Sequence, residues 1–258
     1  MPELPDLAVY IENLMARLKG KTVQSVDYHR DTRLNTSHED LRNSLCNTSI
    51  ASVERSGKEI VFFFSNKATL FVHLMLFGKF TITPDPGSVR FRVLTIGFED
   101  GLSLAVSDHR GLATVRVNPI PSSVPDALEV DLMYLRRKIA EKPRVRAKAF
   151  LMDQAIIRGI GNAYADEILW QARIAPTSIV GKIPDRLIGD FLMSIRSVLI
   201  EAIEEIKRQS PEIISGEVRD FLRVHHSKRS ESPTGHRIMK EKKGSQTTYF
   251  TQEQVLYS

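Results

Sequence analysis

A change in the spacing of apolar residues divides this chain of 258 residues into two parts. Residues 22–118 hold short runs rich in Val, Ile, Phe and Thr, separated by Gly, Asn, Asp and Pro. Such runs are typical of antiparallel strands in a sandwich or barrel. The segment 118–125, NPIPSSVP, has the composition of a connector. Beyond it the pattern is helical, and we predict helices over residues 128–140, 147–157, 163–172 and 184–207.

Both ends of the chain add to this division. Residues 5–19 repeat apolar side chains with a period of about 3.6 and are followed by Gly20, which predicts an amphipathic helix ahead of the strands. The tail from residue 225 is polar and basic, with residues 247–250 as its one strand. The sequence therefore predicts an α+β protein: an N-terminal antiparallel β-sandwich with a leading helix, then a helical domain and a short tail.

The composition is that of a globular protein. Lys and Arg number 36 against 31 Asp and Glu, and 42% of the residues are hydrophobic, which argues against a disordered or collagen-like chain. Cys46 is the one cysteine, so internal disulfides and zinc sites with two or more thiolates are excluded. No stretch approaches the roughly 18–20 apolar residues of a membrane span, and the N-terminus lacks the features of a signal peptide. We expect a cytoplasmic protein that does not bind membranes.

The N-terminus, Met1-Pro2-Glu3-Leu4-Pro5-Asp6, is the first candidate site. If Met1 is removed, Pro2 becomes a secondary amine that can attack a carbonyl-like carbon and form an iminium. Glu3 then lies one residue from the nucleophile, close enough to transfer protons. In the competing interpretation, Pro2 and Pro5 only set the approach to the first helix and Asp6 favours its positive end.

Three further segments each allow two interpretations. The glycine-punctuated turn that starts at Gly159 brings Asn162 to a helix start, where amides bind phosphate, although such turns often only connect helices. Lys58, beside Gly57, is either a phosphate ligand or a solvated surface lysine. DHRGL at 108–112 and HLMLFG at 73–78 are either loops that enter a base stack or an ordinary hairpin turn and core strand.

These segments occur in the order of one family. The chain resembles the formamidopyrimidine-DNA glycosylase and endonuclease VIII family of base-excision repair enzymes. The resemblance rests on these motifs: PELPD at 2–6, GK at 57–58, HLMLFG at 73–78, DHRGL at 108–112, and LMDQAIIRGIGNAYADEILWQARIAP at 151–176, which is similar to the family's helix-two-turns-helix motif.

The resemblance implies three domains and a DNA substrate. They are a catalytic β-sandwich (1–120), a helix-two-turns-helix DNA-binding domain (126–224) and a hairpin similar to a zincless finger (225–258). Double-stranded damaged DNA is the implied partner, bound in the cleft between the domains by a monomer that needs no cofactor and that associates with the nucleoid. The family's purine-recognition loop falls near residues 208–222, where a lesion cap and a plain connector both remain open.

The resemblance also implies roles for single residues. Pro2 attacks C1′ of the damaged nucleotide and expels the base, and Glu3 is the general acid and base. Lys58 and Asn162 hold the flanking phosphates while the base is extruded. Successive β and δ eliminations from the iminium then cut the strand on both sides.

The chain departs from the family at the residues that fill the space of the extruded nucleotide. The family uses Met, Arg and Phe, and the matching residues here are Leu76, Arg110 and Leu112. Leucine is an adequate apolar wedge, but without the phenylalanine ring we expect an altered preference for the opposite base. Asp6 replaces the usual glutamate.

The tail departs further. Family members commonly end in a four-cysteine zinc finger, and this chain has no cysteine after Cys46, so zinc at that place is excluded and no metal site is expected. Residues 236–254 still resemble the hairpin of the zincless-finger members. Gln246 stands where the family has a phosphate-binding arginine, and Lys242 or Lys243 is a candidate to replace its charge.

A basic cluster precedes the glycine turn. Arg144, Arg146, Lys148 and Arg158 are either a solvated helix face or part of the DNA groove. The leading hypothesis is a bifunctional DNA glycosylase with apurinic/apyrimidinic lyase activity that excises oxidised bases. The alternative is a non-catalytic protein that binds lesions or abasic sites and retains the fold.

Overall fold

The computed structural model describes residues 1–30, 32–244 and 246–258. It divides into two compact units, each built from two stretches of chain. The first unit comprises Met1–Pro121 and Ile206–Glu217, and the second comprises Ser122–Glu205 and Val218–Ser258. Residues 206–217 thus follow the helical region in the sequence but are grouped with the first compact unit.

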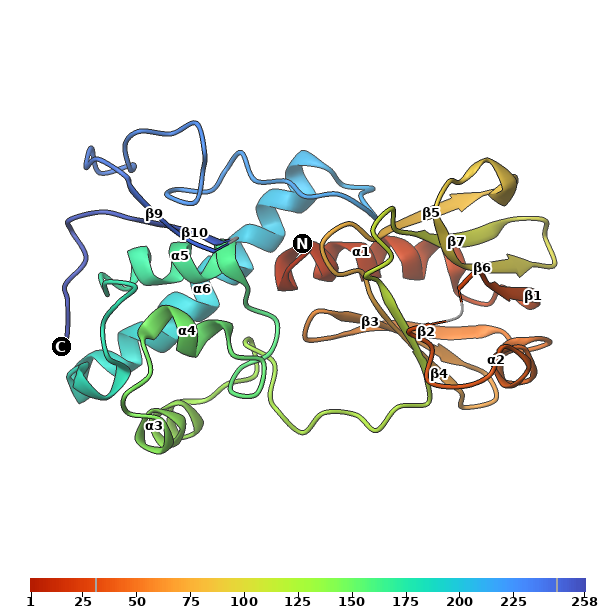
Figure 1. Cartoon of the computed structure of the whole chain (residues 1–258), viewed down its shortest axis with the longest axis horizontal. Coiled ribbons are helices and arrows are strands. Elements are labelled where there is room, and N and C mark those ends of the chain that lie inside the picture. The colour runs from red at the N-terminus through yellow and green to blue at the C-terminus, as the bar shows by residue number, and fades with distance from the viewer. Residues whose placement is uncertain (31, 245) are drawn as a thin grey trace. The chain divides into compact units, whose positions relative to one another are not determined.

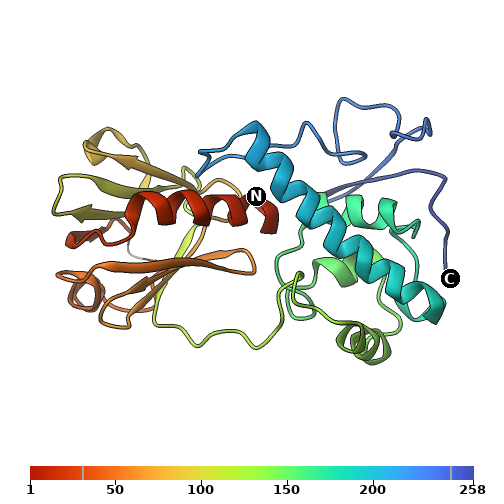
Figure 2. The same ribbon diagram turned by 180° about the vertical axis from the view of Figure 1, so that it is seen from behind.

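The first unit is an antiparallel β-sandwich with a leading helix, α1 (Leu4–Leu18). One sheet has the order β1-β6-β7-β5 and the other β2-β3-β4-β8 (Figures 1 and 2). The strands of the first sheet are β1 (Val23–Tyr28), β5 (Lys79–Thr83), β6 (Arg92–Phe98) and β7 (Ser103–Ser107). Those of the second are β2 (Ile50–Ser56), β3 (Glu59–Phe64), β4 (Thr69–His73) and β8 (Thr114–Val117).

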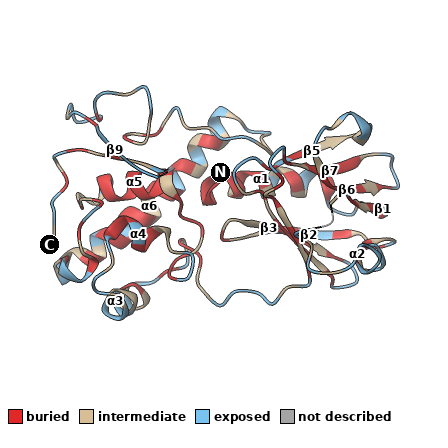
Figure 3. Ribbon diagram, in the orientation of Figure 1, coloured by how far each residue is buried: buried red, intermediate tan, exposed pale blue. Residues whose placement is uncertain are grey.

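Helix α1 contributes one face to the core of this unit. Its residues Leu7, Tyr10, Leu14 and Leu18 are buried in one cluster with the inward side chains of both sheets. Figure 3 shows the resulting band of buried positions along α1 and the strands. The predicted helix over residues 5–19 is therefore confirmed, and its apolar stripe fixes the direction in which the N-terminus enters the unit.

A short helix and a short 3-10 turn interrupt the β region. Helix α2 (His38–Leu45) starts at Ser37, whose hydroxyl accepts a hydrogen bond from the backbone N–H of Asp40 at 3.0 Å. The sequence analysis predicted only strands here. The Ser-x-x-Asp spacing ahead of Leu41 and Leu45 is a helix-start signal that could have revealed α2. A 3-10 turn, η1, covers Pro86–Ser88.

The second unit is mainly helical. It contains α3 (Leu132–Glu141), α4 (Ala147–Met152), α5 (Asn162–Gln171), two 3-10 turns, η2 (Val180–Lys182) and η3 (Asp185–Leu187), and the start of α6 (Ile188–Gln209), followed by a hairpin of β9 (Met239–Lys243) and β10 (Gln246–Phe250). The apolar pattern did not indicate strand β9, because MKEKK is exposed along its whole length and has no apolar alternation, whereas the resemblance of residues 236–254 to a hairpin included it.

Three helices differ in length from the prediction for local reasons. Helix α3 starts at Leu132 rather than 128 because the Asp131 carboxylate caps it, accepting from the N–H of Tyr134 at 2.7 Å. Helix α4 ends at Met152 rather than 157, and the Asp153 carboxylate accepts from the N–H of Ala155 at 2.9 Å, which turns the chain. Helix α6 starts after Pro184 and the 3-10 turn η3.

Residues 210–216, called here the anchored segment, are tied to α1 and β5 within the first unit. The Asn13 side chain donates to the carbonyls of Pro211 and Ile213 at 2.8 and 2.9 Å. The Ser215 hydroxyl accepts from the N–H of Phe80 at 2.6 Å and donates to its carbonyl at 2.7 Å. Ile213 and Ile214 pack against the sandwich core. This stretch is thus a fixed part of the first unit rather than a plain connector.

No helix in the described part of the chain is both long and apolar enough to cross a membrane.

Candidate functional site

The N-terminus is fixed by a reciprocal helix cap. Glu3 is the N-cap of α1, and its backbone N–H donates to Asp6 Oδ2 at 2.8 Å while its own carboxylate accepts from the N–H of Asp6. Both side chains are buried, Glu3 to 3% exposure and Asp6 to 1%. The hexapeptide thus forms a helix cap, and the cap holds the Glu3 carboxylate beside Pro2.

Lys58 lies within the electrostatic reach of this carboxylate. It occupies a two-residue turn between β2 and β3, in which Gly57 has a φ of +63° that an L side chain rarely adopts. Burial lowers the pKa of the Lys58 ammonium, and the negative charge of Glu3 acts in the opposite direction. Lys58 is thus a partly buried cation near the N-terminus, not a solvated surface lysine.

A small cavity of about 170 Å³ adjoins Pro2 in the first unit. Its lining residues come from the N-terminus, the loop between β4 and β5 with the first residue of β5, the loop after β7, and the end of the anchored segment with the residue that follows it. They are Pro2, Leu76, Phe77, Gly78, Lys79, His109, Gly216 and Glu217. The fold therefore brings Pro2 to the two loops that the sequence analysis singled out for entering a base stack.

The loop after β4 presents an apolar side chain to solvent. Leu76 is 54% exposed, whereas Leu74, two residues before it, is buried. A Cβ on Gly78 would lie 2.3 Å from the carbonyl oxygen of Leu74, so this tight turn requires glycine at that position. The turn explains how a core strand can end in an exposed leucine.

The loop after β7 is organised by one buried carboxylate, that of Asp108. It accepts hydrogen bonds from the backbone N–H groups of Arg110 at 2.9 Å, Leu112 at 2.6 Å and Ala113 at 2.7 Å. Burial alone raises the pKa of the Asp108 carboxyl, but these hydrogen bonds outweigh it and hold the pKa below its ordinary value. The clamp leaves Arg110 exposed and Leu112 half-buried.

The two loops contact each other through Phe77. The Arg110 guanidinium lies over the Phe77 ring, 5.3 Å from its centroid, and the His109 ring meets the same ring edge-on at 4.6 Å. Phe77 lies within the HLMLFG motif at 73–78, but the motif assigned it no role of its own. Its position next to Leu76 in an exposed turn was the available signal.

In the second unit, Asn162 is the first residue of α5 and faces the hairpin. Its Nδ2 donates to the carbonyl of Thr247 at 3.1 Å. Its Oδ1 is buried and has no hydrogen-bond partner among the residues that the structure describes. An unsatisfied buried amide oxygen is costly, and such groups are found at functional positions more than elsewhere.

Lys148 is buried rather than solvated, at 8% exposure. Its Nζ lies 2.7 Å from Asp166 Oδ1 and donates to the hydroxyl of Thr248 at 2.9 Å. Asp166 also accepts from the N–H of Tyr249 at 2.9 Å and lies 2.7 Å from Nδ1 of His225. These contacts join α4, α5 and the hairpin into one polar network.

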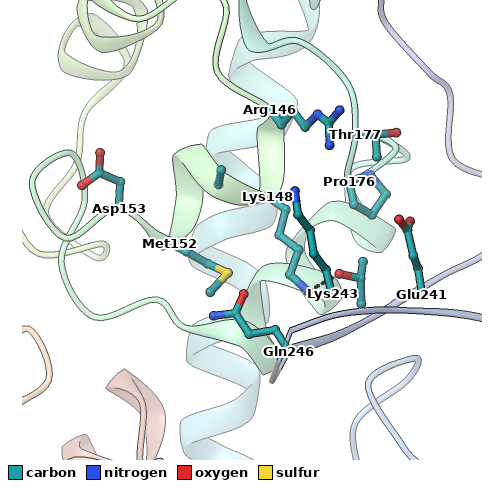
Figure 4. A pocket seen from close by; sticks show the side chains of 11 residues that line it. Arg146, Lys148, Met152, Asp153, Pro176, Thr177, Glu241, Lys243 and Gln246 are labelled. Atoms are coloured by element: carbon teal, nitrogen blue, oxygen red, sulfur yellow. Dashed lines mark hydrogen bonds between the residues drawn. The ribbon is translucent and has the colours of Figure 1, made fainter.

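The hairpin and α4 line a basic cavity of about 550 Å³ (Figure 4). Gln246 pairs with Lys243, and Thr248 with Glu241, so these four side chains share one face of the hairpin. The other lining residues are Arg146, Lys148, Ala149, Met152, Asp153, Pro176 and Thr177. Lys243 and Gln246 therefore lie on the same surface as Arg146 and Lys148.

A carboxylate organises the end of the tail. Glu253 accepts hydrogen bonds from the side chains of Thr234 at 2.8 Å, Thr251 at 3.0 Å and Trp170 at 3.2 Å, and pairs with Arg173 at 2.8 Å. Burial alone raises the pKa of the Glu253 carboxyl, but these donors outweigh it and lower the pKa to about 2. In the described part of the chain, no group of three or more His, Cys, Asp or Glu residues is placed to hold a metal ion.

Two family models match consecutive parts of the chain. The formamidopyrimidine-DNA glycosylase N-terminal domain matches residues 1–115, and the formamidopyrimidine-DNA glycosylase H2TH domain matches residues 123–212. The chain is 32% identical over 208 residues to the formamidopyrimidine-DNA glycosylase of Carboxydothermus hydrogenoformans, covering 79% of this chain and 78% of that protein. With the enzyme of that name from Rickettsia bellii the identity is 30% over 219 residues, with the same coverage.

Solved structures of the same kind match the fold. The complex between Lactococcus lactis Fpg and DNA containing an abasic site gives a TM-score of 0.84 at 26% identity, covering 96% of this chain and 97% of that one. MutM in complex with DNA containing carbocyclic 8-oxo-G gives 0.85 at 26% identity, covering 97% and 98%.

Fold and matches together define a DNA glycosylase built from a β-sandwich and a helix-two-turns-helix domain. The chain belongs to the formamidopyrimidine-DNA glycosylase and endonuclease VIII family.

Proposed function

We propose that this DNA glycosylase uses Pro2 as a covalent nucleophile to excise oxidised bases and then cleaves the strand as an apurinic/apyrimidinic lyase. The observation that supports this most directly is the pairing of a buried Glu3 carboxylate, fixed by the helix cap, with a cavity that Pro2 lines. Removal of Met1 makes the Pro2 nitrogen the terminal amine. Membership of the family does not by itself assign Pro2 as the nucleophile. The cavity that Pro2 lines and the buried Glu3 carboxylate beside it support this assignment.

Three residues of the first unit have different roles in the proposed reaction. The Pro2 nitrogen bonds to C1′ as the glycosidic bond breaks, and Glu3 protonates O4′ so that the sugar ring opens to an iminium. The iminium withdraws electrons and makes the C2′ proton acidic, which permits β elimination and then δ elimination. Lys58, a donor held near Glu3, binds a phosphate that flanks the lesion.

The exposed loops hold the duplex open after extrusion of the nucleotide. Leu76 enters the vacated space as the apolar wedge, and Arg110 contacts the unpaired opposite base. Leu112, half-buried under the Asp108 clamp, supports the same loop. With leucine in place of an aromatic ring at this position, discrimination between opposite bases is weaker.

The second unit supplies phosphate contacts. Asn162 turns its amide N–H₂, which in the structure donates to the carbonyl of Thr247, toward a phosphate, and the α5 start adds its backbone N–H groups. On the basic cavity, Lys148 keeps one N–H beyond those directed at Asp166 and Thr248, and Lys243 supplies the charge that Gln246 lacks. Damaged double-stranded DNA is the partner, the protein acts as a monomer, and it resides in the cytoplasm at the nucleoid.

Borohydride trapping tests the nucleophile. Protein whose intact mass shows the loss of Met1 is incubated with a duplex that contains an abasic site, in the presence of reductant. We expect a stable protein–DNA adduct that is lost in Pro2→Gly and in protein that retains Met1. If correctly processed protein binds the duplex but gives no adduct, the non-catalytic alternative is correct.

The lesion class is tested separately with duplexes that contain 8-oxoguanine, formamidopyrimidine, thymine glycol or a hydantoin. We expect base release from at least one of the oxidised purines, as the names of the relatives suggest. Release from none of the four, with the abasic duplex still cut, would show a lyase without glycosylase activity.

A further inference from the structure

We propose that Glu217 is a second catalytic carboxylate: it accepts the proton that the Pro2 amine releases on bonding to deoxyribose, and it is the counter-charge of the iminium. This inference rests on the proposed role of Pro2 and extends it to a residue that no motif singled out.

The Glu217 carboxylate lies next to the amino group of the N-terminus. The amino group of Met1 forms an ion pair with Oε1 of Glu217, whose side chain is 32% exposed. Pro2 and Glu217 line the same cavity. Removal of Met1 makes the nitrogen of Pro2 the terminal amine, one residue further along the chain and about 3.8 Å away between Cα atoms. The processed amine therefore stays within reach of a glutamate side chain that already binds an amine in this place.

The position of Glu217 is set by the anchored segment, residues 210–216. Asn13 holds the start of that segment, Ser215 is hydrogen-bonded to both backbone groups of Phe80, and the Tyr10 hydroxyl donates to the carbonyl of Gly216, the residue before Glu217. These ties come from α1 and β5, two elements of the first unit. Because these hydrogen bonds fix the backbone of residues 210–216, the side chain of the next residue, Glu217, is held in place.

The other ionisable groups near the cavity are suited to different tasks. The Glu3 carboxylate is committed to the helix cap and to protonation of O4′. Lys58 and Lys79 are cations that only donate, and His109 packs its ring against Phe77. Among these described neighbours of Pro2, Glu217 is the acceptor on the side of the anchored segment.

The lone pair of the Pro2 nitrogen forms the N–C1′ bond while the C1′–base bond breaks and its electrons leave with the base. The nitrogen now carries one proton too many, and Glu217 takes it. Glu3, having first taken up a proton from solvent, then gives that proton to O4′ as the C1′–O4′ bond breaks, and the nitrogen lone pair forms the C1′=N iminium. The Glu217 proton returns to solvent, and the restored carboxylate stabilises the cation.

The test is the pH profile of borohydride trapping on abasic duplex, under single-turnover conditions from about pH 6 to about pH 9, a range that brackets the α-amino group. In Glu217→Gln two changes are expected together. The plateau rate falls by about a hundredfold or more because the proton acceptor is lost. The acid limb moves to lower pH, by about half a unit or more, because the Pro2 ammonium has lost its counter-charge.

Two matched variants separate catalysis from structure. Glu212→Gln lies in the same anchored segment, where Glu212 is 87% exposed and pairs with Arg17, and it should keep the wild-type plateau and midpoint. Glu217→Asp retains the charge, so its acid limb should stay near that of the wild type while its plateau lies between the two.

A fall in the plateau with an unmoved acid limb would mean that Glu217 only supports the fold, and the proposal is then wrong. Unchanged kinetics in Glu217→Gln also overturn it. Absence of adduct from the processed wild-type protein is a different result, since it rejects Pro2 itself.

Discussion

The Arg110 guanidinium lies over the ring of Phe77, 5.3 Å from its centroid, and so joins the two exposed loops beside Pro2. Contacts of this type contribute about 0.5–2 kcal/mol, depending on how far they exclude water. Because Phe77 is next to Leu76, the contact holds Arg110 close to Leu76, the proposed wedge.

Phe77→Ala should therefore slow base excision from duplex DNA. We expect a loss of roughly 3- to 30-fold in the single-turnover rate, from the same energy range. Strand scission at a pre-formed abasic site should fall less, since no base has to be displaced there. Phe91→Ala is the matched control because Phe91 is also an exposed aromatic residue near His109, 6.4 Å from it. Equal losses in the two variants would show that Phe77 has no specific role in supporting the proposed wedge.

Asp108→Asn tests the clamp of the second loop. Asparagine replaces two acceptor oxygens with one, and its amide N–H₂ would face backbone N–H groups. We expect a loss of about 1–3 kcal/mol in the free energy of unfolding at neutral pH, measured by urea titration. Asp27→Asn, which breaks an exposed ion pair with Arg42, should cost little.

The same carboxylate predicts a pH dependence. Its folded-state pKa is lowered, so its stabilising contribution is complete above the ordinary pKa of an aspartate and is lost as the pH falls below about 4. The wild type should lose stability over that window more steeply than Asp108→Asn. Parallel curves for the two proteins would contradict the clamp.

The sequence predicted those parts of the fold that depend on residues close together in the chain. The β-sandwich, the leading helix and the start of α5 followed from periodicity and from motifs of adjacent residues, and the structure confirmed them. Helix α2 was missed although Ser37 and Asp40 signalled it. The packing of residues 206–217 on the first unit was not predictable, because it depends on Asn13 and Phe80, far away in the sequence.

The candidate site shows the same limit. Pro2, Glu3 and Lys58 came from motifs, but the reason that Lys58 is partly buried near Glu3 is the geometry of a hairpin turn. Lys148 was selected as one of a basic cluster, and only the fold reveals that it is buried against Asp166. Glu217 and Glu253 lie outside any motif, since each matters through partners that are distant in sequence.

Glu253→Gln tests whether one carboxylate holds the tail together without a metal. Its contacts join the loop at Thr234, the end of β10, helix α5 through Trp170 and the turn after α5 through Arg173. We expect thermal unfolding at a lower temperature and weaker DNA binding, with a cost of about 1–3 kcal/mol. Glu231→Gln, at an exposed position of the tail that does not line the basic cavity, is the control. A chelator should affect neither protein.

Protonation should mimic this substitution at low pH. Because the folded-state pKa of Glu253 is about 2, the stabilisation is complete above its ordinary value of 4.5 and disappears as the pH falls from there toward about 2. A wild-type tail that stays equally protected from hydrogen exchange across this range would show that other contacts suffice.

Gln246→Arg should strengthen DNA binding. Gln246 pairs with Lys243 across the hairpin, and both face the basic cavity with Lys148. An arginine there adds one cation that can bind a phosphate through two parallel hydrogen bonds. Each neutralised phosphate changes the slope of log K against log salt by about 0.9 for duplex DNA, so the variant should bind more tightly at low salt and with a slope steeper by about that amount. Gln252→Arg adds the same charge at the exposed end of the tail, away from this cavity. If both variants steepen the slope equally, the hairpin face has no special role and net charge alone explains the binding; if neither does, DNA does not contact this surface.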